Sequence, residues 1–176
     1  AEGLGAGALP AVTYLFISGM HVGDAGASAL AAALGQGALP RLKFLSLSFG
    51  TTIGDAGLVA LAPALRRLPA LETLGLQYNP FGDEGLAALV APPPPAGAPP
   101  PPTGGLAKLK QLWLNYTQIT DAGCATLVAA LDSGALPALG YVDLARIPAS
   151  ADGAALVALH RRFRRQVWCT PGSGRL

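Results

Sequence analysis

The sequence predicts an α/β solenoid, in which a unit of one strand and one helix recurs along the chain. Similar units open at Leu9, Leu39, Leu68, Leu106 and Leu136, with spacings of 30, 29, 38 and 30 residues. Each unit has leucines with the alternation of a strand, followed by an Ala- and Leu-rich stretch with the spacing of a helix. A repeat of roughly 20–50 residues indicates stacked units with a shared core, because no unit buries its apolar face alone.

Each unit is expected to begin with a strand. Its apolar residues follow one pattern in the five units: Val12, Leu15 and Ile17; Leu42, Leu45 and Leu47; Leu71, Leu74 and Leu76; Leu109, Leu112 and Leu114; Leu139, Val142 and Leu144. Residues two apart share a face of a strand. The last two residues of each set are therefore expected to point into the core, and the residues beside them to point away from it.

A glycine-rich turn and a helix are expected to follow each strand. Asp24, Asp55, Asp83 and Asp121 stand just before the helical stretches, at the N-cap position, where a carboxylate accepts a bond from a first-turn N–H group. Capping explains these aspartates better than acid–base chemistry does. The helix residues expected on the core face are Ala27, Leu30 and Leu34; Leu58, Leu61 and Leu65; Cys124, Leu127 and Leu131; Leu156, Leu159 and Phe163.

Prolines interrupt the third unit. Pro93 stands where other helices have a core leucine, so this helix is expected to end near Ala91. The proline run is interpreted as a tolerated insertion or, alternatively, as a polyproline ligand for SH3- or WW-type domains. The expected organisation is a remnant of a preceding repeat at 1–8, a repeat domain at 9–165 with the proline-rich insertion at 92–104, and a flexible tail at 166–176.

The stretch Leu68–Val90 nearly spells the pattern L-P-x-L-x-x-L-x-L-x-x-N-x-I-G-D-A-G-x-x-A-L-A-x-A-L, with Asn79 in place. It resembles the ribonuclease-inhibitor type of leucine-rich repeat, and the resemblance extends over residues 9–165. This implies a right-handed β/α horseshoe arc, with a parallel sheet on the concave side and helices on the convex side. The family includes ribonuclease inhibitors, the repeats of NOD-like receptors and the activator of the Ran GTPase. The resemblance therefore implies macromolecular recognition on the concave side or its edges.

The sequence departs from the family pattern at the asparagine. Met20, Gly50, Thr117 and Ile147 stand at the position of Asn79 in the other units. In the family, this asparagine binds backbone groups of the turn. We therefore expect a less regular ladder of turns in this chain.

The candidate functional residues are the strand positions that face away from the core. Eight of the chain's eleven aromatic residues lie at these positions or just past the strands, the latter being Phe49, Tyr78 and Tyr116. Exposed aromatic rows are typical of protein-binding surfaces, although aromatic propensity for a half-buried sheet would give the same pattern. We expect a partner to bind Tyr14, Phe16, Phe44, Gln77, Gln111, Trp113, Asn115, Tyr141 and Asp143.

Composition narrows the classes of function. The formal net charge is +2, and the two cysteines and two histidines have no metal-ligand or disulfide-framework spacing. The longest apolar runs are far shorter than a membrane-spanning helix requires. We therefore expect a cytoplasmic protein-interaction module with no enzymatic activity, cofactor or membrane attachment, which is a monomer or part of a longer chain.

Two alternative functions remain open. One is a regulator of a small GTPase, of the activating type, by fold analogy alone; Arg146 is the nearest candidate for a catalytic arginine and a poor one. The other is nucleic-acid contact through the arginines of His160–Arg165. Arginines are also favourable near the C-terminal end of a helix, which accounts for this cluster without any nucleic acid.

Overall fold

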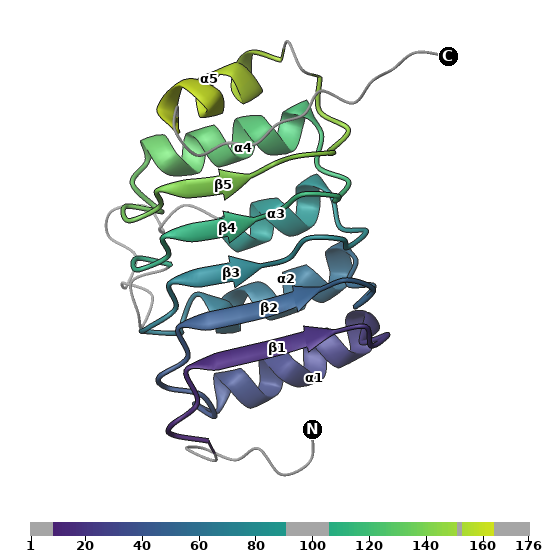
Figure 1. Ribbon diagram of the computed structural model, residues 1–176, viewed down its shortest axis with the longest axis vertical. Coiled ribbons are helices and arrows are strands. Elements are labelled where there is room, and N and C mark those ends of the chain that lie inside the picture. Colours follow the sequence, from purple (N-terminus) through teal and green to yellow (C-terminus); the bar gives the residue numbers. More distant parts are fainter. Residues whose placement is uncertain (1–8, 91–105, 151–152, 164–176) are drawn as a thin grey trace, which may run out of the picture.

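The chain folds as an alternating series of strands and helices (Figure 1). The computed structural model describes residues 9–90, 106–150 and 153–163. The elements in these ranges are β1 (Tyr14–Ser18), α1 (Gly23–Gly35), β2 (Phe44–Ser48), α2 (Asp55–Leu65), β3 (Thr73–Gly75), α3 (Asp83–Val90), β4 (Gln111–Trp113), α4 (Asp121–Asp132), β5 (Tyr141–Asp143) and α5 (Ala154–Arg162).

The strands form one parallel sheet in the order β1-β2-β3-β4-β5. In Figure 1 the strands lie in front and the helices cover the sheet from behind. Among the described residues, each helix packs against the helices that precede and follow it, and each strand pairs with its sequence neighbours. This arrangement confirms the predicted α/β leucine-rich-repeat solenoid. We call the side of the sheet that no described helix covers the open face.

The core contains the leucines that the repeat pattern predicted. From the second unit to the fifth, every predicted strand position is buried. The predicted helix positions are also buried, except Leu30, which is half-buried. In the first unit, Val12, Leu15 and Ile17 are only partly buried, although they pack against the core. The core side chains are therefore well buried from the second unit to the fifth and less buried at the β1 end.

The recurring aspartates connect neighbouring units, which corrects the prediction that each caps its own helix. Gly54 and Thr120 occupy the N-cap positions of α2 and α4, and the aspartates follow within the first turn. Their carboxylates instead accept backbone N–H bonds from the next unit: Asp24 from Gly54 (2.7 Å), Asp55 from Gly82 (2.9 Å) and Gly85 (2.7 Å), Asp83 from Thr120 (2.8 Å), and Asp121 from Ser150 (3.1 Å). Asp24, Asp55 and Asp83 therefore bind the start of the helix that follows their own, and Asp121 binds the loop that precedes α5.

Asn79 ties the second and third units together, as the resemblance implied. Its amide group donates to the Leu47 carbonyl oxygen at 2.7 Å and the Leu76 carbonyl oxygen at 3.0 Å. Its Oδ1 accepts from the Ile53 N–H group at 3.0 Å and the Thr51 hydroxyl at 2.7 Å. The Thr51 hydroxyl, from the turn of the second unit, completes this network.

The predicted domain limits fall mostly outside the described residues. These limits are the repeat remnant at 1–8, the insertion at 92–104 and the tail at 166–176. Helix α3 is described as far as Val90, one residue short of its predicted end. Within the described ranges, no helix combines the length and apolar character needed to cross a membrane.

Candidate interaction surface

Side chains on the open face stand in three rows that run across the strands. The pairing register fixes the rows, because each strand aligns with the next at the same position of the repeat. The third row continues this register two residues beyond the second. The rows are Tyr14, Phe44, Thr73, Gln111 and Tyr141; Phe16, Ser46, Gly75, Trp113 and Asp143; and Ser18, Ser48, Gln77, Asn115 and Ala145.

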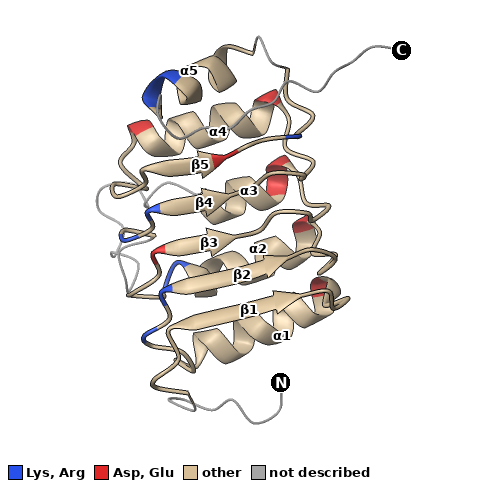
Figure 2. Ribbon diagram, viewed as in Figure 1, with Lys and Arg blue, Asp and Glu red and all other residues tan. Residues whose placement is uncertain are grey.

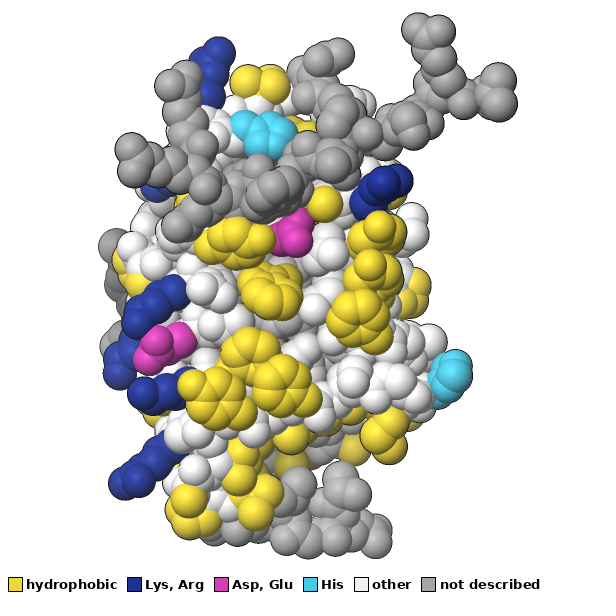
Figure 3. Space-filling view, in the orientation of Figure 1, with side chains coloured by type: hydrophobic (Ala, Val, Ile, Leu, Met, Phe, Trp, Pro, Cys, Tyr) yellow, Lys and Arg dark blue, Asp and Glu magenta, His cyan; other side chains and the backbone are white. Residues whose placement is uncertain are grey.

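An aromatic cluster covers the β1–β2 end of the open face. The Phe44 ring lies 4.6 Å from the Phe16 ring and 5.9 Å from the Tyr14 ring, measured between centroids. Tyr14 and Phe16 are 63% and 65% exposed. Figure 3 shows hydrophobic side chains gathered over these two strands. The structure therefore places these three predicted residues together on a solvent-exposed surface.

The centre of the open face is more closed than the sequence suggested. Gln77 faces the predicted side but is only 5% exposed, so the expectation of an exposed side chain is wrong. A Cβ atom added to Gly75 would lie 2.9 Å from Gln77 Oε1, which shows that the Gln77 side chain fills the space that glycine leaves. Gln77 Oε1, Trp113 Nε1 and Asn115 Oδ1 are buried without hydrogen-bond partners among the described residues.

Asp143 and Tyr141 lie at the β5 end, both half-buried. Burial raises the pKa of the Asp143 carboxyl, and the bond that it accepts from the Ala145 N–H group at 3.0 Å acts in the opposite direction. Burial and the nearby Asp143 charge raise the pKa of Tyr141. Among the described residues of the three rows, Asp143 carries the one formal charge.

A second aromatic group follows the C-terminal ends of the strands. The Tyr78 ring stacks on Phe49 at 4.5 Å and on Tyr116 at 4.2 Å, between centroids. All three residues have left-handed backbone, with φ of 52° to 59°, and are 38–53% exposed. We name this group the corner stack. Their shared position just past the strands was the sequence signal for this stacking.

Charged residues lie mainly beyond the two ends of the strands rather than on the open face (Figure 2). Lysines and arginines cluster where the strands begin, and acidic residues mark the helix starts. Glu72 lies between Lys110, 2.7 Å away, and Lys43, 3.9 Å away. The bond from Lys110 lowers the pKa of Glu72.

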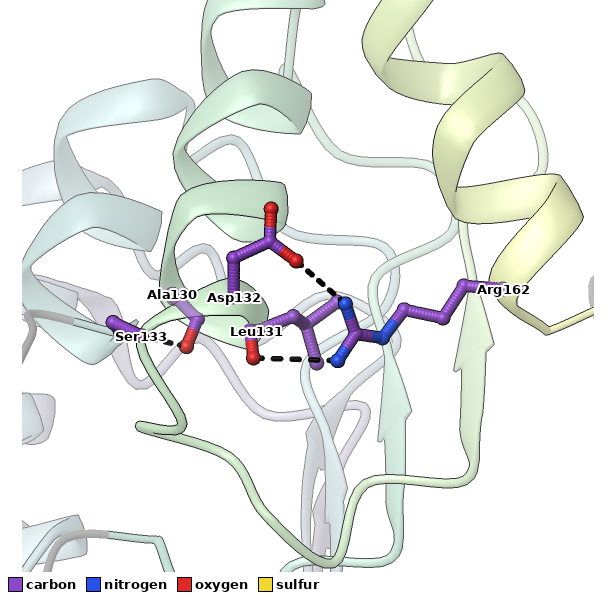
Figure 4. Close-up of polar contacts among 5 residues, drawn as sticks. All are labelled: Ala130, Leu131, Asp132, Ser133 and Arg162. Atoms are coloured by element: carbon purple, nitrogen blue, oxygen red, sulfur yellow. Dashed lines mark hydrogen bonds and ion pairs between the residues drawn. The ribbon is translucent and has the colours of Figure 1, made fainter.

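The described part of the C-terminal arginine cluster packs against the preceding unit (Figure 4). Arg162 forms an ion pair with Asp132 at 2.6 Å and donates to the Leu131 carbonyl oxygen at 3.3 Å, near the C-terminal end of α4. Arg161 is exposed. Arg146, the candidate for a catalytic arginine, is exposed beyond β5 with a φ of 59°.

Cys124 is fully buried in α4, as its core position predicted. In the described ranges, no three His, Cys, Asp or Glu side chains are grouped closely enough to hold a metal ion. The exposed and half-buried aromatic residues described above lie on two surfaces, the open face and the corner stack.

Comparisons with known proteins agree with this architecture. The profile of the family described as Leucine Rich repeat matches residues 39–62 and 68–90. Ribonuclease inhibitor from Sus scrofa is 33% identical over 122 residues, which cover 69% of this chain and 24% of the inhibitor. The chain thus spans about a quarter of that relative's length. The solved structure of Leiomodin-1 Actin-Binding Site 2 is similar with a TM-score of 0.60 and 15% identity, over 89% of this chain and 82% of the other.

Proposed function

Because this chain is a leucine-rich repeat protein of the ribonuclease-inhibitor type, we propose that it binds another protein through its open face. The observation that carries the proposal is a pair of aromatic groups on the two sides of β3: Tyr14, Phe16 and Phe44 on β1 and β2, and Trp113 and Tyr141 on β4 and β5. Aromatic side chains provide a large contact area for little rotamer entropy, and they dominate the binding energy of many interfaces.

The polar residues of the open face support the same proposal. Gln111, Asn115 and Asp143 lie among the aromatic side chains and supply hydrogen-bonding groups. An interface with apolar anchors and a few polar groups is typical of specific protein recognition. With one charge in its three described rows, this surface would lose little free energy through desolvation of ionised groups when a partner covers it.

Affinity capture from a native lysate tests the proposal. The wild-type protein is compared with the Trp113→Ala/Tyr141→Ala double variant and with Val59→Ala, a control on the exposed side of α2. We expect the wild type and the control to retain the same protein and the double variant to lose it. Equal capture by all three proteins, with intact folding shown by circular dichroism, would refute a role for these aromatic residues.

Two defined probes sharpen the experiment. A ribonuclease and actin are the binding partners that the names of the two similar proteins suggest. Each can be titrated against the wild type and the double variant by calorimetry. Binding that the Trp113→Ala/Tyr141→Ala change weakens by tenfold or more would identify the partner class; failure of both probes would leave the lysate experiment to decide.

The two alternative functions remain predictions with their own assays. A GTPase activator would speed nucleotide hydrolysis by a small GTPase, and Arg146→Ala would abolish that effect. Nucleic-acid binding through the last helix would weaken steeply as salt concentration rises. The contacts of Arg162 with α4 favour a structural role for at least that arginine.

A further inference from the structure

Four polar side chains lie at neighbouring positions of the open face, toward its β5 end. In the register of the sheet, Trp113 stands between Gly75 and Asp143. Backbone bonds of 2.9 Å and 3.0 Å continue this register past the strands and set Gln77 beside Asn115. We call Gln77, Trp113, Asn115 and Asp143 the polar centre. Neighbouring strands lie about 4.8 Å apart, so this group spans about 10 Å across three strands.

Three side chains of the polar centre have buried polar atoms without hydrogen-bond partners among the described residues. The atoms are two amide oxygens, Gln77 Oε1 and Asn115 Oδ1, and one N–H group, that of Trp113 Nε1. Gln77 as a whole is only 5% exposed. Native proteins leave few buried polar atoms unpaired, because each costs free energy. Three such atoms at adjoining positions of one surface therefore point to a partner that pairs them.

The fourth side chain of the polar centre, Asp143, has no cation beside it. Its carboxylate accepts a bond from the Ala145 N–H group at 3.0 Å, and no lysine or arginine in the described ranges forms an ion pair with it. Burial raises the pKa of Asp143, which means that its surroundings oppose the charged form. A cation placed against this carboxylate would favour the charged form instead.

The unpaired groups define the chemistry of their complement. The polar centre offers two amide oxygens and a carboxylate as acceptors, and the three rows of the open face contain no positive charge. The complement is therefore a cation with several N–H donors. An arginine guanidinium spreads its donors over a plane, whereas a lysine ammonium concentrates them at one point. The Trp113 ring, next to Asp143, provides an aromatic surface on which a guanidinium can stack.

We propose that the polar centre is a binding site for an arginine side chain of the protein that binds the open face. The guanidinium lies against the Trp113 ring and donates to the Asp143 carboxylate. The Gln77 and Asn115 side chains rotate so that their oxygens accept from it as well, and the Trp113 N–H group donates to a backbone carbonyl oxygen of the partner. This inference rests on the proposed function, because the partner supplies the arginine.

Short peptides test the site directly. The probe is acetyl-Gly-Ala-Arg-Ala-Gly-amide, titrated against the isotope-labelled protein in NMR experiments that follow the indole N–H resonance of Trp113, assigned with Trp113→Phe. The matched peptide carries citrulline, which has nearly the shape of arginine without its charge. We expect the arginine peptide to shift the resonance until the site is saturated. The citrulline peptide should bind about tenfold more weakly, because it lacks the charge that pairs with Asp143.

Three variants locate the binding. Asp143→Asn removes the charge and keeps the shape, so it should weaken binding of the arginine peptide about tenfold. Gln77→Met removes the unpaired oxygen and keeps the length of the side chain. This variant should bind the peptide more weakly and yet have a higher urea midpoint, because a buried unpaired atom is lost. Glu84→Gln is the matched control: it removes an exposed carboxylate on α3, away from the open face, and should bind as the wild type does.

Three results would overturn the inference: no shift of the Trp113 resonance at millimolar peptide, equal affinity for the arginine and citrulline peptides, or unchanged affinity in Asp143→Asn. The proposed function has its own test in the capture experiment. A partner that is lost by Trp113→Ala/Tyr141→Ala and retained by Asp143→Asn would keep the open face as the binding surface and reject arginine recognition at the polar centre.

Discussion

Replacing Asn79 by alanine removes a side chain that joins three stretches of backbone. In the wild type, the Asn79 amide group binds the Leu47 carbonyl oxygen, and Oδ1 binds the Ile53 N–H group and the Thr51 hydroxyl. Asn79 and Thr51 are buried, with 3% and 0% exposure. Water therefore cannot readily replace the lost partners, and the alanine variant leaves these polar groups unpaired.

The expected loss follows from counting those groups. A buried polar group left unpaired costs about 1–3 kcal/mol. Two backbone groups at about 1.5 kcal/mol each, with about 1 kcal/mol for the rotatable Thr51 hydroxyl, give about 4 kcal/mol. Domains are stable by about 5–15 kcal/mol, so Asn79→Ala should remove a large fraction of the total. With a urea dependence of about 2 kcal/mol per M, the midpoint should fall by about 2 M.

Urea unfolding followed by circular dichroism measures this shift. Thr117→Ala is the control, because Thr117 stands at the same repeat position and its hydroxyl makes one bond, to the Leu114 carbonyl oxygen at 2.7 Å. That variant should lose about 1 kcal/mol, or about 0.5 M. If Asn79→Ala shifts the midpoint no more than Thr117→Ala does, the bonds of Asn79 do not hold the turns together and the reasoning fails.

Two further predictions concern carboxylates. Asp55 accepts two backbone N–H bonds and Asp24 accepts one, so Asp55→Ala should lose about 2 kcal/mol and Asp24→Ala about 1 kcal/mol in urea titrations; the reverse order would contradict the cross-unit caps. Burial raises the pKa of Asp143, so its charged form opposes folding at neutral pH, and that effect is relieved as pH falls through the raised pKa. Asp143→Asn keeps an acceptor for the Ala145 N–H group, so this variant should be at least as stable as the wild type at neutral pH. It should also gain less stability than the wild type when the pH is lowered. If the wild type and the variant show the same dependence of stability on pH, Asp143 is not the source of that dependence.

The leucine spacing predicted the fold because burial leaves a local trace in the sequence. Leu45 and Leu47 point into the core for the same reason that any alternating strand residues share a face, and Leu58, Leu61 and Leu65 follow the helical period. No knowledge of distant residues is needed for either inference. The recurrence of this pattern in five units then predicted that the units stack on one another and share a core.

The details of the candidate surface depend on neighbours that a single unit does not reveal. The bond from Gly82 to Asp55 joins residues 27 positions apart. The local Gly-Asp pattern contains no sign of so distant a partner, and it therefore suggested a cap within one helix. Gln77 is buried because Gly75 leaves space beside it, which alternation alone does not predict. The corner stack requires left-handed backbone, for example at Tyr78, a conformation that tyrosine rarely adopts.

The neighbour-only packing of the helices has a mechanical consequence. In the described chain, α1 contacts α2 but no more distant helix, and the other helices follow the same rule. Each unit is therefore held in place only by the units next to it, and the stack can bend elastically as a spring does. Small changes in the angle between units add up along such a spring and alter the distance between β1 and β5. A partner that gripped the aromatic side chains at both ends of the open face would fix that distance, and would thereby stiffen every unit between them.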